Sequence, residues 1–196
     1  MDHLAAHAEA TARNAERIAA LAADGLGART PCPDWSVADL VAHMIGGQAI
    51  FAGALGGQPP PMPAPDADPA TLALSYEDAA AAAVAAFAAP GALDRDAEVP
   101  IGTVPGGMVV ALAVNEAIVH GWDLAAATGQ DTTIDETLAA DLLAGAQMTV
   151  GPQLRAPDGA MPFFGPAVAV ADDAPASDRL LAFLGRDPGW RPHHSV

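Results

Sequence analysis

The segment Thr30-Pro-Cys-Pro-Asp-Trp-Ser-Val-Ala-Asp-Leu-Val-Ala-His43 predicts a rigid turn that leads into a helix. Its two prolines fix the backbone dihedral φ, which favours a turn at the start of the segment. Ser36 followed by Asp39 resembles a capping box, in which each side chain bonds the other residue's backbone N–H at the start of a helix. We therefore expect a helix over residues 37–55, with His43 inside it.

The rest of the chain also alternates apolar helical patterns with Gly- and Pro-containing breaks. Residues 58–69 are rich in Pro, Gly, Ala and Asp and predict a surface loop, whereas residues 97–104 suggest an extended segment. No repeat of 20–50 residues occurs, which excludes a solenoid. We predict an all-α fold with further helices over residues 2–24, 75–89, 108–128, 135–150 and 179–184. Ser75 is an expected N-terminal cap for the helix over 75–89, and Thr133 or Asp135 for the helix over 135–150.

The length of the chain limits the number of domains. A chain of 196 residues is long enough for one well-buried core, but hardly for two independent domains. We expect one main helical domain over residues 1–152 and a C-terminal extension, residues 153–196, packed on it.

Charge and composition narrow the classes of partner. The net charge is −16 and all eight basic residues are Arg, so the surface would repel nucleic acid phosphates and anionic lipids. No stretch approaches the roughly 20 strongly apolar residues that cross a bilayer, and no export signal is visible. Because the single cysteine, Cys32, cannot form an internal disulfide, we expect a soluble cytoplasmic protein.

Candidate metal ligands lie on two of the predicted helices. In Glu116-Ala-Ile-Val-His120 the i, i+4 spacing places both side chains on one helix face, with Cβ atoms about 5–6 Å apart. His43 lies among apolar residues, where an imidazole without a partner would be costly to bury and metal ligation would remove that cost. Two imidazoles and a carboxylate suit a borderline ion such as Zn²⁺, with one position left for water.

Each of these residues also has a simpler interpretation. An acidic residue and a histidine at i, i+4 often form an ordinary surface pair. A core histidine such as His43 can bond a backbone carbonyl or Asp39, one turn earlier. The spacing alone leaves a metal site and ordinary pairing both open.

Two longer strings resemble a known family. They are residues 30–43, quoted above, and Asn115-Glu-Ala-Ile-Val-His-Gly-Trp-Asp-Leu-Ala125. Both are similar to actinobacterial proteins related to the N-terminal domain of mycothiol-dependent maleylpyruvate isomerase, within the DinB/YfiT-like superfamily. Phe164-Gly-Pro-Ala-Val168 and Asp178-Arg-Leu-Leu-Ala-Phe-Leu-Gly-Arg-Asp-Pro188 resemble the tail of one metal-binding branch of that group. The resemblance covers nearly the whole chain.

This resemblance implies a fold and a ligand set. The fold is an up-down-down-up four-helix bundle, here with additional short helices and the C-terminal extension. The ligands are a histidine on the second helix and an E-x-x-x-H or H-x-x-x-H pair on a later helix, which bind Zn²⁺ or Ni²⁺. His43, Glu116 and His120 occupy those positions. The isomerase relatives also carry a C-terminal domain that helps bind substrate, and the tail of this chain does not resemble it.

Neighbouring polar residues have two interpretations each. Asp123 could orient His120 by a hydrogen bond, or it could cap or solvate the end of the helix. Asp39 could do the same for His43, or it could belong to the capping box. We expect Cys32 to be a small buried residue. We expect Trp35 and Trp122 to contribute to packing, and the histidines near the termini, including His7, to bind metal only casually.

Three functions are compatible with such a site. In the first, the metal deprotonates a low-molecular-weight thiol such as mycothiol, and the thiolate attacks an electrophile in a transferase or isomerase reaction. The second is a non-catalytic, dimeric metal-binding module that binds or senses a ligand. In the third, the metal is a structural staple, which three ligands fit poorly because they leave its coordination shell incomplete.

Overall fold

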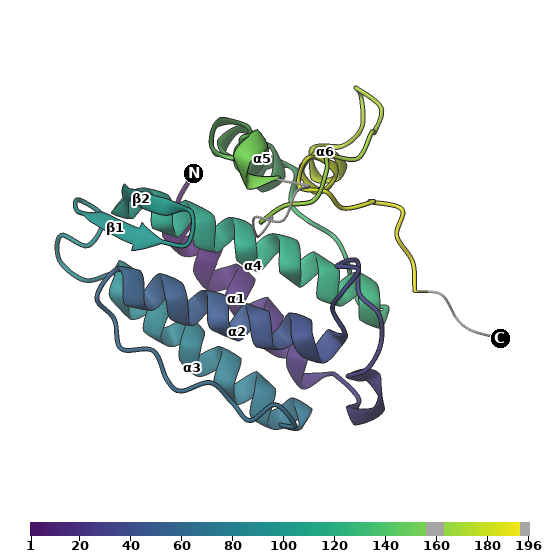
Figure 1. The fold of residues 1–196 in the computed structure, drawn as a ribbon, viewed down its shortest axis with the longest axis horizontal. Helices are drawn as coiled ribbons and strands as arrows, with labels where there is room; N and C mark the ends of the chain where they lie inside the picture. Colours follow the sequence, from purple (N-terminus) through teal and green to yellow (C-terminus); the bar gives the residue numbers. More distant parts are fainter. Residues whose placement is uncertain (156–162, 193–196) are drawn as a thin grey trace. The chain divides into compact units, whose positions relative to one another are not determined.

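The computed structural model describes residues 1–155 and 163–192 and confirms the all-α class (Figure 1). The chain divides into two compact units, Asp2–Asp131 and Thr132–Val196, the latter together with Met1. In chain order the elements are α1 (His3–Ala19), the 3-10 turn η1 (Ala23–Gly25), α2 (Val37–Ala54), α3 (Pro69–Phe87), β1 (Asp96–Val99), β2 (Gly102–Pro105), α4 (Gly106–Thr128), α5 (Glu136–Thr149), the 3-10 turn η2 (Pro152–Leu154) and α6 (Ala176–Phe183).

The capping box predicted at the start of α2 is present. Ser36 Oγ accepts a hydrogen bond from the Asp39 backbone N–H at 3.2 Å, and Asp39 Oδ2 accepts one from the Ser36 backbone N–H at 3.0 Å. The preceding turn is closed by Thr30, whose hydroxyl lies 3.0 Å from the carbonyl oxygens of both Cys32 and Trp35. Local chemistry therefore determines where α2 begins.

Helices α1 to α4 form the predicted up-down-down-up bundle. α1 and α2 each pack against both α3 and α4. Residues 55–68 join α2 to α3, and at about 3.3 Å per residue they are long enough to return along an 18-residue helix. Figure 1 shows this connection running the length of the bundle, so α2 and α3 point the same way. The fold class expected from the sequence is confirmed.

Two helix boundaries differ from the sequence prediction by five or more residues. α3 begins at Pro69 rather than near Ser75, because the Asp68 carboxylate accepts a hydrogen bond from the Thr71 N–H at 2.9 Å. Proline is favourable at this first position since its missing N–H would have no helical partner. Helix α1 ends at Ala19 rather than at residue 24, and a 3-10 turn follows. The predicted start of α3 and end of α1 were therefore wrong.

The extended segment predicted before α4 is an antiparallel hairpin. Asp96 pairs with Pro105 and Val99 with Gly102. Both strands contact α4, and β1 also contacts α2. The hairpin thus leads directly into the helix that carries Glu116 and His120.

The interior of the first unit combines an apolar core with buried polar groups. Its largest fully buried side chains are Ile18, Leu40, Met44, Ile45, Leu55, Tyr76, Phe87 and Leu124. Among them, the Asn14 amide donates to the Ala117 carbonyl at 2.8 Å and to the Tyr76 hydroxyl at 3.2 Å. Other polar side chains buried in this unit are His7, Thr11, Thr30, Gln48 and Asp123. Buried polar groups require hydrogen-bond partners, and the partners of Gln48 and Asp123 are Glu116 and His120 of the candidate site.

The second unit contains α5 and α6. Asp135 caps α5 by accepting a hydrogen bond from the Leu138 N–H at 2.8 Å, as one of the two predicted caps. The Glu136 carboxylate accepts hydrogen bonds from the Ser177 hydroxyl at 2.6 Å and from the Ser177 backbone N–H at 3.2 Å. These bonds connect the first residues of α5 and α6. The predicted division of the chain at residue 152 stays a prediction.

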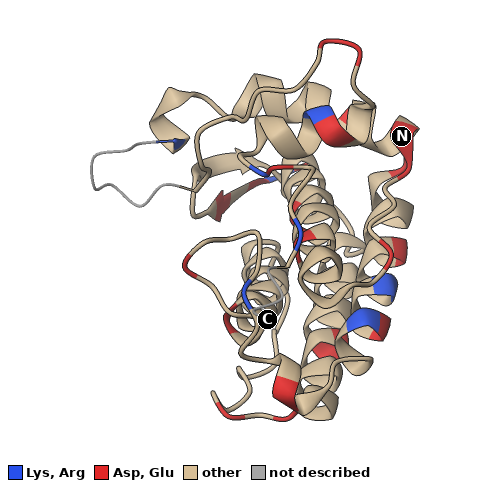
Figure 2. Ribbon diagram, turned by 90° about the vertical axis from the view of Figure 1, so that its right-hand side faces the viewer, with Lys and Arg blue, Asp and Glu red and all other residues tan. Residues whose placement is uncertain are grey.

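Two helices, α2 and α4, are long and apolar enough to cross a bilayer by length and composition alone, so the expectation that no stretch of the sequence approaches such a span was wrong. This is weak evidence, because core helices of soluble proteins have the same properties. Both are core helices of the bundle, and they carry the buried polar side chains of Gln48 and Asp123. The sequence has 24 acidic and 8 basic residues, which are coloured red and blue on the ribbon in Figure 2.

Candidate metal centre

The three predicted ligands converge in the first unit. His43 comes from α2, and Glu116 and His120 come from adjacent turns of α4. One ligand atom from each residue lies within 4.8 Å of the others, and His43 Nε2 is 4.0 Å from Glu116 Oε1. Two ligands that are each about 2.1 Å from one ion lie no more than about 4.2 Å apart. Only small side-chain rotations would therefore be needed to bind one ion.

The ligands differ in exposure. The side chains of Glu116 and His120 are each 12% exposed, whereas that of His43 is 41% exposed. The expectation that His43 lies in an apolar interior is therefore wrong, because its position on α2 faces outward. Its ring lies 4.5 Å from the ring of Trp35 and 4.7 Å from that of His120, measured between centroids. Trp35 is thus part of the site and is only partly buried.

Glu116 provides the test of whether these residues suit a metal. Its Oε1 is shielded from solvent and has no hydrogen-bond partner within residues 1–155 and 163–192, while Oε2 accepts a hydrogen bond from Gln48 Nε2 at 3.2 Å. Burial raises the pKa of this carboxyl to about 8, against the opposing effect of the Gln48 hydrogen bond. A buried carboxylate oxygen without a donor is well suited to a cation, so the residues present fit a metal ion.

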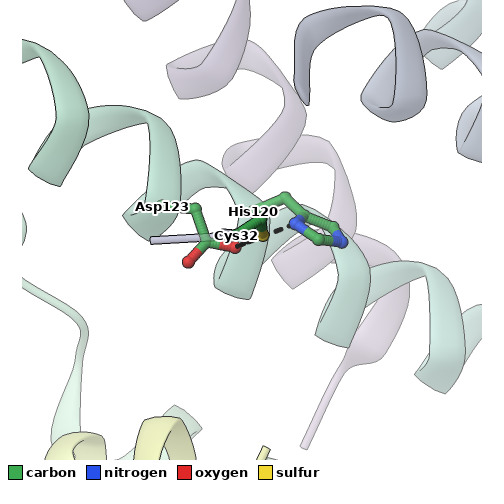
Figure 3. Close-up of side chains that lie close together, drawn as sticks. All are labelled: Cys32, His120 and Asp123. Atoms are coloured by element: carbon green, nitrogen blue, oxygen red, sulfur yellow. Dashed lines mark hydrogen bonds and ion pairs between the residues drawn. The ribbon is translucent and has the colours of Figure 1, made fainter. Parts of the chain in front are cut away.

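Asp123 forms a hydrogen bond with the His120 ring. Its fully buried carboxylate lies between two groups, with Oδ2 2.9 Å from His120 Nδ1 and 3.5 Å from the Cys32 sulfur (Figure 3). An ionised carboxylate only accepts hydrogen bonds, so the proton belongs on His120 Nδ1 and the ring offers Nε2 to a metal. Cys32 is only half-buried, and its thiol donates to Asp123, so its expected role as a simple buried residue is wrong.

Asp39 belongs to the helix cap. Its carboxylate accepts hydrogen bonds from both the N–H and the hydroxyl of Ser36, and these bonds lower the pKa of Asp39. Of its two interpretations, the structure therefore confirms the capping box.

The sequence analysis did not identify Gln48 and His7, which form a hydrogen-bond chain to Glu116. Gln48 and His7 are completely buried, and Gln48 Oε1 lies 2.7 Å from His7 Nε2. The His7 ring also packs edge-on against Phe87, with centroids 5.0 Å apart. The view of His7 as a casual ligand near a terminus was wrong, because α1 places it inside the bundle. The one available signal was a lone amide, Gln48, within an otherwise apolar part of α2.

The fold and this ligand cluster define a DinB-like helical bundle. The sequence matches the family described as the mycothiol maleylpyruvate isomerase N-terminal domain over residues 7–125, and the chain therefore belongs to this family.

Relatives and solved structures agree with this assignment. Two uncharacterised proteins of Mycobacterium tuberculosis are each 40% identical over 193 residues, covering 95% of this chain and 98% of theirs. A crystal structure of a mutant of the mycothiol-dependent maleylpyruvate isomerase resembles the chain with a TM-score of 0.57 and 18% identity, over 76% of this chain and 72% of that one. A second crystal structure of that isomerase gives 0.56 and 18%, over 72% and 68%. At this identity the likeness shows the fold.

Proposed function

We propose that the protein binds one divalent metal ion through His43, Glu116 and His120. The observation that carries this proposal is the buried Glu116 Oε1, which lacks a hydrogen-bond partner among the described residues and lies 4.0 Å from His43 Nε2. Two imidazoles and a carboxylate favour Zn²⁺, with Ni²⁺ as the alternative. Asp123 orients the His120 ring for this purpose.

The site further supports a thiol-dependent transferase or isomerase. When bound, the metal supplies a Lewis acid that lowers the pKa of a coordinated thiol and keeps its sulfur anionic at neutral pH. The exposed side of the site, at His43 and Trp35, is where a small thiol and an electrophile would be held. Mycothiol is the proposed thiol because the family is named for a mycothiol-dependent isomerase. We place this activity in the cytoplasm, without a nucleic acid or membrane partner.

A second candidate is a non-catalytic, homodimeric metal-binding module that binds or senses a small ligand. It is favoured by the C-terminal part of the sequence, residues 153–196, which does not resemble the C-terminal domain of the isomerase relatives. A change in dimer affinity on metal removal, without turnover of any thiol, would favour this module over the enzyme.

The metal proposal is tested by elemental analysis of untagged protein and of its His43→Ala, Glu116→Ala and His120→Ala variants. We expect about one ion per wild-type chain and a clear loss in each variant. Full occupancy in all three variants would refute the ligand assignment. The enzyme proposal is then tested by metal-dependent consumption of mycothiol with model electrophiles, in isomerisation, conjugation and thiol-transfer assays. The absence of turnover in all of these assays would refute the enzyme proposal and favour the non-catalytic metal-binding module.

A further inference from the structure

The Glu116 carboxylate lies against the backbone of α2 at Gly47. A Cβ atom added to Gly47 would be 2.7 Å from Glu116 Oε1 and 3.0 Å from its Cδ. The first distance is shorter than Cβ atoms show in real structures, so the carboxylate would have to move. A Cβ added to the adjacent Gly46 would have nothing within 4 Å. The two neighbouring glycines therefore differ: only Gly47 provides the space that the carboxylate occupies.

The next residue, Gln48, holds the other oxygen of the same carboxylate. Its Nε2 donates to Glu116 Oε2, and its Oε1 lies 2.7 Å from His7 Nε2. Since the amide NH₂ faces Glu116, the amide oxygen faces His7, which must then carry its proton on Nε2. The result is a hydrogen-bond chain with one direction, from His7 to Gln48 to Glu116, in which His7 and Gln48 are fully buried.

We propose that Gly47 and Gln48 are positioning residues for the metal centre. Gly47 leaves room for the Glu116 carboxylate, and Gln48, anchored by His7, fixes its rotation so that Oε1 faces His43. A glutamate side chain has several rotatable bonds, so its carboxylate can take many orientations. A hydrogen bond to one carboxylate oxygen restricts these orientations and fixes the direction of the other oxygen. This inference rests on the proposed metal site.

The adjacent glycines supply a matched pair of variants. Alanine favours a helix more than glycine does at either position, so both variants are expected to fold. We expect Gly47→Ala to weaken Zn²⁺ binding by about 10- to 100-fold, the usual effect of disturbing groups that orient a ligand. Gly46→Ala should bind Zn²⁺ as the wild type does. Affinity is measured by competition with a chromogenic chelator, and folding by the thermal melt of the metal-free protein.

Gln48→Met provides an independent test, because methionine keeps the length of the side chain and removes both hydrogen bonds. We expect a loss of Zn²⁺ affinity similar to that of Gly47→Ala. In Co²⁺-loaded protein, both variants should alter the visible absorption bands, which report coordination geometry, whereas Gly46→Ala should not. A purely structural role would lower the melting temperature and leave these bands unchanged.

The outcomes separate the two proposals. If the wild type binds no Zn²⁺, the proposed function fails and this inference fails with it. If the wild type binds Zn²⁺ and the folded Gly47→Ala and Gln48→Met variants match its affinity and its Co²⁺ spectrum, the metal site stands and the positioning roles are refuted.

Discussion

The two sides of the site are built differently. On the α4 side, Glu116 and His120 are each 12% exposed, and each is held by a buried partner, Gln48 and Asp123 respectively. On the α2 side, His43 is 41% exposed and lies against the partly buried Trp35 ring. The difference is consistent with the proposed metal site, in which the inner side would orient the ion and the exposed outer side would admit small molecules.

The largest expected effect is the loss of an inner ligand. We expect Glu116→Ala or His120→Ala to weaken Zn²⁺ binding by about 1,000-fold or more, since a lost ligand costs more than the roughly 10- to 100-fold of a lost orienting group. His43→Ala should cost less, about 100-fold, because water reaches the exposed position and can replace the imidazole. Chelator competition on all three variants measures this, and equal losses would show that the two sides do not differ.

Metal binding should also stabilise the fold. A free ion concentration of 100 times Kd adds about 2.7 kcal/mol to the free energy of unfolding. For a chain of this size that corresponds to a rise in melting temperature of about 5–10 °C. Thermal melts with Zn²⁺ and with a chelator measure the rise, and Glu116→Ala should show almost none. A much larger fall on chelation, with no exchangeable water on the ion, would instead indicate a structural staple.

The next effect concerns the group that orients His120. We expect Asp123→Asn to weaken Zn²⁺ binding by about 10- to 100-fold, because an amide satisfies the His120 and Cys32 donors less well than a carboxylate. Asp39→Ala is the matched control, since it removes an aspartate of the same helix bundle that serves only the capping box of α2. It should lower the melting temperature and leave the affinity unchanged. Equal affinity losses in both variants would contradict the orienting role of Asp123.

The smallest expected effect is a pH dependence from His7. Burial lowers the pKa of His7 below its ordinary value of 6.5, against the opposing effect of the Gln48 hydrogen bond. As pH falls below about 6.5, the unfolded chain takes up a proton while folded His7 stays neutral, so His7 contributes a loss of stability. The raised pKa of Glu116 contributes in the opposite direction over the same range, because the folded chain then binds the extra proton. The loss is at most about 1.4 kcal/mol per pH unit.

Urea denaturation of metal-free protein between pH 5 and 7 measures this dependence. The difference between the wild type and His7→Phe isolates the His7 contribution, because Glu116 is present in both proteins. As pH falls, the wild type should lose stability relative to His7→Phe, although the absolute stability of the variant will differ because Gln48 loses a partner. Identical slopes in the two proteins would mean that His7 does not carry the dependence.

The sequence predicted correctly those features that depend on only a few neighbouring residues. The caps at Ser36 and Asp135 could be predicted because their hydrogen bonds span three residues. The pairing of Glu116 with His120 on one face follows from helix geometry. The start of α3 was misplaced because two N-terminal signals compete, and the Asp68-Pro69 signal prevails over the one at Ser75.

The sequence by itself therefore determined where most of the helices lie, the caps of α2 and α5, and the placement of Glu116 and His120 on one helix face, all of which depend on local backbone geometry. Only the tertiary structure decided that His43 faces outward, that Cys32 and His120 share Asp123, and that Gly47 and Gln48 hold Glu116. Except for the contact between His120 and Asp123 within α4, these contacts join residues that are 68 to 91 positions apart in the sequence. They arise from the packing of one helix or turn on another, which the spacing of residues along the chain does not specify.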